Sequence, residues 1–238
     1  MEETYCTKTI ILGRTAFREY DSRTTVYSLE RGKLDLVARG VKKIKSKLAA
    51  HLEPLNLAEI MVVAGKRFDY IGAVSSQNCF PRIKGDLSKL VAAGKAVNMF
   101  NKLVKAEEAD KEVFFLLEEF LEFLDSNKLK ISSDLWASLF TLKILAQLGY
   151  RPRLYNCVIC NNKITPEKNL FDLGRGGLIG KECLNKKGND SLIISNDGIK
   201  VLRAIIDNGL KKLKNLKISA KLETEIKDII SSFYQYHI

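Results

Sequence analysis

The chain has 238 residues, of which 46% are hydrophobic, a composition typical of globular proteins that bury a sizeable core. It contains no apolar run near the roughly 20 residues that cross a bilayer, and the opening MEETYCTK lacks the order of a signal peptide. We therefore expect a cytoplasmic protein with no membrane partner. Five cysteines, an odd number, argue against a disulfide framework and leave metal binding or buried thiols.

Positive charge is concentrated at the two ends of the chain. There are 39 Lys and Arg against 28 Asp and Glu, and the net charge is +5 over residues 1–50, +1 over 51–84, −2 over 85–150 and +7 over 151–238. Basic ends suit a polyanion such as nucleic acid, because each phosphate that Lys or Arg neutralises releases a condensed counterion. The alternative is a solvated surface that its charge keeps soluble.

Residues 1–80 have the pattern of short strands separated by turns. The strand-like stretches are rich in Thr, Tyr, Val and Ile or alternate apolar with polar residues, and they cover residues 5–12, 24–30, 33–40, 56–65 and 68–76. Five strands with no long helix among them predict a small closed β-barrel, of which the OB-fold is a version that binds nucleic acids. We assign residues 1–80 to this domain.

From Asp86 the apolar period becomes helical. Leu87, Leu90, Val91 and Gly94 share one predicted face, and Val97, Phe100, Leu103 and Val104 continue it. Further helices are predicted over 112–126, from the cap Ser132-Ser133-Asp134 to a stop at Gly149, over 197–213, and over 222–238. Residues 81–155 and 190–238 are therefore predicted to form one helical domain.

Residues 156–189, between the two helical parts, form a loop-rich insertion with three cysteines. Cys157 and Cys160 have the C-x-x-C spacing of a metal site, and Cys183 follows downstream. A structural zinc ion takes four protein ligands, and these three cysteines supply only three. The ligand set is therefore incomplete, and the sequence predicts one structural zinc ion at most.

Catalytic motifs are hard to find. Only His51 and His237 are available for a histidine-based mechanism, and the glycine-rich GRGG lacks the residues of a phosphate loop. A binding function is therefore the remaining alternative to catalysis, and the amino-terminal region carries residues suited to it. Arginines lie in or beside the predicted strands, and four lysines fall within residues 42–47. Tyr5, Phe17, Tyr20 and Tyr27 interleave with them, either as platforms for nucleobases or, individually more often, as barrel core.

Two stretches carry a resemblance to a known family. They are GKLDLVARGVKKIKS, from Gly32 to Ser46, and LGYRPRLYNCVIC, from Leu148 to Cys160. With the sequence around them, they make the region from near Thr9 to about Cys183 resemble the bacterial recombination mediator family RecO. The resemblance implies an α+β multidomain fold with an amino-terminal OB-fold β-barrel, followed by an α-helical domain with a small zinc-ribbon-like insertion.

The resemblance also implies a non-enzymatic role in DNA repair. RecO-like proteins bind single- and double-stranded DNA, anneal complementary strands, associate with RecR, contact the acidic tail of single-strand DNA-binding protein and help load RecA; dependence on RecF is left open. Such a protein would be associated with the nucleoid. Carried over to this sequence, the DNA contacts would be Arg14, Arg18, Arg31, Lys33, Arg39, Lys42, Lys43, Lys45 and Lys47.

Lys143, Arg151 and Arg153 are our hypothesis for the tail-binding site. An acidic tail that ends in an aromatic residue needs an apolar notch rimmed by cations. Cations near a helix C-terminus are also what the helix dipole favours, so a purely structural role is the alternative. For the whole protein, the rival hypothesis is a non-catalytic assembly adaptor whose OB barrel binds a protein partner.

The cysteines depart from the family pattern. Relatives with a full site are expected to place a third cysteine where this sequence has Gly180, three residues before Cys183. Cys6 and Cys79 fall in the predicted barrel. Because metal affinity depends on a complete ligand set, we favour a decayed site held by packing over a zinc bound by Cys157, Cys160 and Cys183.

Overall fold

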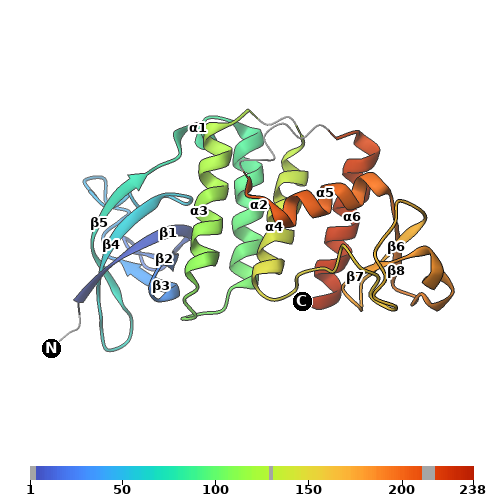
Figure 1. The fold of residues 1–238 in the computed structure, drawn as a ribbon. Coiled ribbons are helices and arrows are strands. Elements are labelled where there is room, and N and C mark those ends of the chain that lie inside the picture. Colours follow the sequence, from blue (N-terminus) through green and yellow to red (C-terminus); the bar gives the residue numbers. More distant parts are fainter. Residues whose placement is uncertain (1–3, 129–130, 211–217) are drawn as a thin grey trace. The chain divides into compact units, whose positions relative to one another are not determined.

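The computed structural model describes residues 4–128, 131–210 and 218–238, which form a mixed α+β protein with a β-rich first part and a helical second part (Figure 1). The strands are β1 (Thr4–Ala16), β2 (Ser22–Ser28), β3 (Gly32–Ala38), β4 (Leu57–Val63), β5 (Tyr70–Asn78), β6 (Asn169–Asp172), β7 (Gly177–Ile179) and β8 (Ser191–Ile194). The helices are α1 (Pro81–Lys84), α2 (Leu87–Leu103), α3 (Lys111–Ser126), α4 (Ser133–Gln147), α5 (Asn196–Asp207) and α6 (Ala220–His237), with a 3₁₀-helix at Lys181–Lys186.

The first five strands close into a barrel in the order β1-β2-β3-β5-β4. All five were predicted from the sequence, and the closing contact is a parallel pairing of Val37 with Tyr70. β1 serves two partners, pairing with β4 through its first half and with β2 through its second, with a register shift between Ile11 and Gly13. The core contains Ile11, Val26, Leu36, Ile60 and Val62, so the predicted alternation places apolar side chains inside.

α2 and α3 pack on the barrel near β2 and β3. The Tyr27 ring lies 4.9 Å from that of Phe100 on α2, and its hydroxyl donates to the carbonyl of Glu108. Lys8 on β1 forms an ion pair of 2.7 Å with Glu118 on α3. These contacts explain why the first compact unit of the structure, Met1–Ser126, includes both the barrel and helices α1 to α3.

The predicted buried face of α2 is wrong in its first half. Leu87 is 77% exposed, Leu90 is 40% exposed and Val91 is 37% exposed. The helix instead buries the face that carries its alanines, because small side chains allow close packing. That face also buries the stem of Lys89, whose ammonium group donates to the carbonyl of Asp125.

The second compact unit, Asn127–Ile238, contains α4, α5, α6 and a three-stranded sheet in the order β7-β6-β8. The predicted cap of α4 is present, since the Ser132 hydroxyl accepts the backbone N–H of Leu135. α6 buries Ile226, Ile229, Ile230 and Phe233, as its stripe predicted. The predicted helix over 197–213 is observed as α5, but it ends earlier than predicted, at Asp207, because Asn208 has an extended backbone; residues 211–213 of the prediction lie outside the described part of the chain.

The two compact units, Met1–Ser126 and Asn127–Ile238, have different bounds from the three domains predicted from the sequence. The predicted domain bounds stay a prediction. The sheet of the second unit lies within and just after the insertion predicted over residues 156–189. Among the described residues, none of the helices combines the length and the apolar content that crossing a bilayer requires.

Candidate functional site

Three chain segments meet at one end of the barrel. They are the β1–β2 turn, the residues that follow β3, and the β4–β5 turn. Backbone hydrogen bonds hold them together: the Val37 N–H donates to the Asp69 carbonyl at 2.9 Å, and the Lys42 N–H donates to the Tyr20 carbonyl at 3.0 Å. The Asp21 carboxylate accepts the N–H of Gly40 at 2.8 Å, which fixes the sharp exit from β3.

This end carries basic and aromatic side chains that contact one another. We call it the basic aromatic patch, and it consists of Phe17, Arg18, Tyr20, Arg23, Arg39, Lys42, Lys43, Arg67, Phe68 and Tyr70. At its centre, the Phe17 and Phe68 rings meet edge to face, with centroids 5.4 Å apart and an angle of 76° between their planes.

Guanidinium groups surround this ring pair. Arg23 lies 5.5 Å from the Phe17 centroid and 5.8 Å from that of Phe68. Arg18 lies 5.1 Å from the Phe17 centroid, and Arg67 lies 5.5 Å from that of Phe68. Such cation–π contacts hold positive charge beside an apolar surface without cancelling it.

The rest of the patch repeats this pairing. The guanidinium carbon of Arg39 lies 3.8 Å from the ring centroid of Tyr70, and the Lys43 ammonium lies 5.6 Å from that of Tyr20. Tyr20 is 48% exposed. Arg18, Arg23 and Arg39 form no ion pair in the described part of the chain, so no described carboxylate neutralises their charge at close range.

The predicted DNA-binding residues divide into two groups in the structure. Arg18, Arg39, Lys42 and Lys43 belong to the basic aromatic patch. Exposed residues continue from it: Lys45 and Lys47 in the same loop, and Arg14 on β1, whose guanidinium donates to the Ala49 carbonyl at 3.1 Å. Arg31 and Lys33 lie at the other end of β2 and β3, where Ser28 pairs with Gly32.

Lys33 and Arg31 make internal contacts at that end. The Lys33 ammonium donates to the carbonyls of Asn101 and Val104, at 2.9 and 2.8 Å, where α2 ends. The Arg31 guanidinium carbon lies 3.8 Å from the centroid of the Tyr5 ring. Of the four aromatic residues singled out in the sequence, Tyr27 alone is fully buried, with 1% exposure.

Sequence reasoning missed Arg67, Phe68 and Tyr70. Their stretch KRFDY, residues 66–70, has the pattern of the start of a strand, and the signal that marks it is a pair of cations directly before an aromatic residue. What brings it to the patch is the barrel closure between β3 and β5, which no local pattern shows.

The three cations predicted to bind a protein tail are occupied within the second unit. The Lys143 ammonium donates to the carbonyls of Ile205 and Asn208, at 3.1 and 2.7 Å, where α5 ends. Arg151 forms an ion pair of 2.9 Å with Asp207. Arg153 donates to the side chain of Asn161 at 2.7 Å. The tail-binding assignment stays a prediction.

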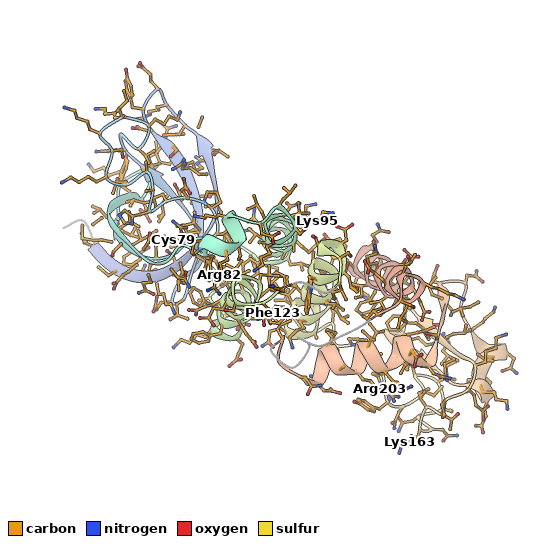
Figure 2. The ribbon with its side chains drawn as sticks, turned by 90° about the horizontal axis from the view of Figure 1, so that it is seen from above. Cys79, Arg82, Lys95, Phe123, Lys163 and Arg203 are labelled. Atoms are coloured by element: carbon orange, nitrogen blue, oxygen red, sulfur yellow. The ribbon has the colours of Figure 1, made fainter. Side chains whose placement is uncertain are left out.

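The three cysteines of the insertion come together. The sulfur atoms of Cys157, Cys160 and Cys183 all lie within 4.8 Å of one another; Cys157 and Cys183 are buried and Cys160 is exposed. Cys6 and Cys79 belong to the other compact unit, where Cys79 follows β5 close to Arg82 of α1 (Figure 2). The cluster therefore offers three sulfur ligands to a metal.

Hydrogen bonds around the cluster favour the thiolate form of Cys157 over that of Cys183. Burial raises the pKa of Cys157, but hydrogen bonds from the backbone N–H groups of Cys160, Gly180 and Ile159 outweigh it and lower that pKa to about 7. Hydrogen bonding with Cys160, together with burial, raises the pKa of Cys183 to about 11. A cavity of about 460 Å³ opens beside the cluster. It is lined on one side by the C-x-x-C loop and Lys163, which is labelled in Figure 2, and on the other by the residues around Gly180.

Comparison with known proteins identifies the family. A family model described as "Recombination protein O C terminal" matches residues 84–238, and one described as "Recombination protein O N terminal" matches residues 1–80. The chain belongs to the RecO family. This confirms the resemblance that the two motifs indicated, and it associates the chain with DNA repair and recombination.

Curated RecO proteins align over nearly the whole chain. Identity is 30% over 229 residues to the DNA repair protein RecO of Desulforamulus reducens, covering 96% of this chain and 88% of that protein. It is 30% over 220 residues for that of Dehalococcoides mccartyi strain CBDB1, covering 92% and 85%. It is 26% over 234 residues for that of a Thermoanaerobacter species, covering 98% and 92%.

The structure explains why the first RecO-like motif, Gly32 to Ser46, begins with glycine and lysine. Gly32 has a φ of +67°, and an added Cβ would lie 2.3 Å from the carbonyl oxygen of Glu108, so only glycine fits. Lys33 then bonds to the end of α2. The first two residues of the motif therefore fix the barrel on its helices, whereas Arg39 to Lys47 carry its exposed charge.

Proposed function

We propose that this RecO-family chain is a non-catalytic mediator of DNA repair that binds single- and double-stranded DNA through the basic aromatic patch of its barrel. The observation that carries the proposal is a cluster of exposed cations without ion-pair partners among the described residues, on loops that the barrel holds at one end. The strand order and the position of these loops support an OB-fold, which binds nucleic acid with its L12 and L45 loops.

We further propose that the chain anneals complementary strands and, with RecR, helps load RecA where single-strand DNA-binding protein coats a gap. The physical basis is electrostatic. Two DNA strands repel each other, and a surface with several unpaired cations lowers that repulsion by neutralising phosphates of both. The Arg and Lys residues of the patch, with Lys45 and Lys47 beside it, supply this charge on a rigid frame.

Salt dependence tests DNA binding and separates it from the adaptor hypothesis. Affinity for a fluorescent single-stranded oligonucleotide is measured at several salt concentrations for the wild type and for Lys43/Lys45/Lys47→Ala. We expect a linear log-log plot whose slope is shallower in the variant, by about 0.7 for each phosphate that the variant no longer neutralises. An adaptor that uses its charge only for solubility would show no measurable binding even at low salt.

Lysines on helices α2 and α3 provide a matched control variant. Lys95/Lys102/Lys111→Ala removes the same charge from exposed helix positions in the same unit and should keep the wild-type slope. Annealing of complementary oligonucleotides should slow in Lys43/Lys45/Lys47→Ala and not in the control, and should slow further when Lys42 is replaced as well. Equal losses in both variants would show that net charge, and not the patch, governs binding.

The cysteine cluster is proposed to have a structural role. It fastens the C-x-x-C loop to the residues around Gly180 and Cys183, and zinc, if bound, would use Cys157, Cys160 and Cys183 as ligands. The set lacks one protein ligand of a structural zinc site, so we propose that packing carries most of the stability of this region.

A further inference from the structure

The aromatic side chains of the patch do not belong to the barrel core. The buried cluster inside the barrel contains Ile11, Val26, Leu36, Ile60 and Ile71 but neither Phe17 nor Phe68, which are half-buried at the rim. Leaving phenylalanine rings partly in water sacrifices hydrophobic stabilisation. Placing two such rings together, at the tips of turns, therefore suggests that they meet a ligand with an apolar face.

The chemistry around the rings defines that ligand. Arg18, Arg23 and Arg67 surround the ring pair, so the ligand must combine a flat apolar surface with negative charge within a few ångströms. A nucleotide does this, because its base stacks on an aromatic ring while its phosphate pairs with a guanidinium group. A phosphorylated peptide or an acidic protein segment without an aromatic residue would satisfy the charges and leave the rings unused.

We propose that Phe17 and Phe68 form a stacking platform for the bases of unpaired DNA, and that Arg39 on Tyr70 extends it. This inference rests on the proposed DNA binding and deepens it by naming the contacts that distinguish single strands from duplexes. The Arg39 guanidinium carbon lies 3.8 Å from the Tyr70 centroid, and an arginine plane offers a second surface on which a base stacks.

Stacking selects unpaired DNA because the faces of bases inside a duplex are already covered by neighbouring bases. A duplex therefore meets only the cations of the patch, whereas a single strand meets the cations and the rings. Stacking also uses the face of a base and leaves its Watson–Crick edge open. A strand held in this way can still pair with its complement, which is what annealing requires.

Three oligonucleotides of equal length test the proposal: a single strand of thymidines, a backbone of the same number of phosphates with no bases, and a blunt duplex. For the wild type at one salt concentration, we expect the thymidine strand to bind at least about fivefold more tightly than the abasic strand, the lower end of what one stacked base supplies. This comparison requires no substitution.

The variant Phe17→Leu/Phe68→Leu keeps apolar volume at the rim and removes the rings. We expect it to lose most of the preference for the thymidine strand over the abasic strand, keeping only what stacking on Arg39 and Tyr70 supplies, with unchanged affinity for the abasic strand and the duplex. Phe115→Leu is the matched control, because Phe115 is 48% exposed on α3, outside the patch, and it should keep the wild-type preference. Circular dichroism of all three proteins verifies that they are folded.

The outcomes separate this inference from the proposed function. If the wild type binds the thymidine and abasic strands equally, stacking is refuted and DNA binding stands. If it binds none of the three oligonucleotides at low salt, the proposed function fails and the platform with it. A folded double variant that retains the full wild-type preference for bases would overturn the assignment to Phe17 and Phe68.

Discussion

Replacing Lys33 by Met tests whether this lysine stabilises the fold or binds DNA. Its ammonium donates two hydrogen bonds, of 2.9 and 2.8 Å, to the carbonyls of Asn101 and Val104, where the dipole of α2 leaves partial negative charge. Hydrogen bonds from a charged group contribute about 1.5 to 3 kcal/mol each when buried, and less at this half-exposed site. We therefore expect a loss of about 2 kcal/mol in the free energy of unfolding of the first unit.

For a unit of this size, such a loss lowers Tm by about 7 °C. The only tryptophan, Trp136, lies in the second unit, so far-UV circular dichroism is the signal to follow. Lys47→Met is the control, since Lys47 is an exposed loop residue and its replacement should leave Tm unchanged. The reasoning is refuted if Lys33→Met keeps the wild-type Tm and weakens oligonucleotide binding more than Lys47→Met does.

Three further predictions concern other sites. Gly32→Ala should lower the free energy of unfolding by at least about 3 kcal/mol in a denaturant titration, because the added Cβ would lie 2.3 Å from a backbone oxygen and φ is +67°; a wild-type midpoint would contradict this. Gly180→Cys should raise the zinc content measured by elemental analysis to nearly one per chain, since a Cβ there would lie 3.9 Å from that of Cys157 and meet nothing closer than 3.5 Å; stoichiometric zinc in the wild type would show that three cysteines suffice. Asp172→Asn should cost about 1 to 3 kcal/mol at pH 7, because that buried carboxylate accepts hydrogen bonds from Arg175 and Ser191. Burial raises the pKa of Asp172, but these bonds outweigh it and hold that pKa below its ordinary 3.8, so the stabilisation is present above pH 3.8 and is lost as pH falls through the lower folded pKa; a gap in Tm between wild type and variant that fails to narrow below pH 3.8 would refute the assignment.

The sequence predicted the elements well because their patterns are local. Strand-favouring composition and local alternation identified the five barrel strands, and the cap at Ser132 marked the start of α4. The buried face of α2 was predicted wrongly, since a helix with alanines on one face and larger apolar residues on the other has two candidate faces. Which face is buried depends on the neighbouring helices, and the sequence does not show how closely they approach.

The roles of the basic residues were also impossible to predict from local sequence patterns. From the sequence, Lys33 and Lys43 are equivalent: both follow a glycine closely and both lie in the RecO-like motif. In the structure, Lys33 lies against the end of α2, whereas Lys43 lies beside the exposed ring of Tyr20. What separates them is the position of helix carbonyls that come about 70 residues later in the chain, which no local pattern contains.

Lys143 repeats the arrangement of Lys33 in the second unit. Each ammonium donates to two carbonyls at the C-terminal end of a helix, α2 for Lys33 and α5 for Lys143. A cation in this position is stabilised by the helix dipole and is not available to a phosphate without breaking those bonds. The net charge of +11 therefore overstates the charge that DNA can meet. The charge relevant to binding is the local density of unpaired cations at the barrel end, where loops from three parts of the chain converge on Phe17 and Phe68.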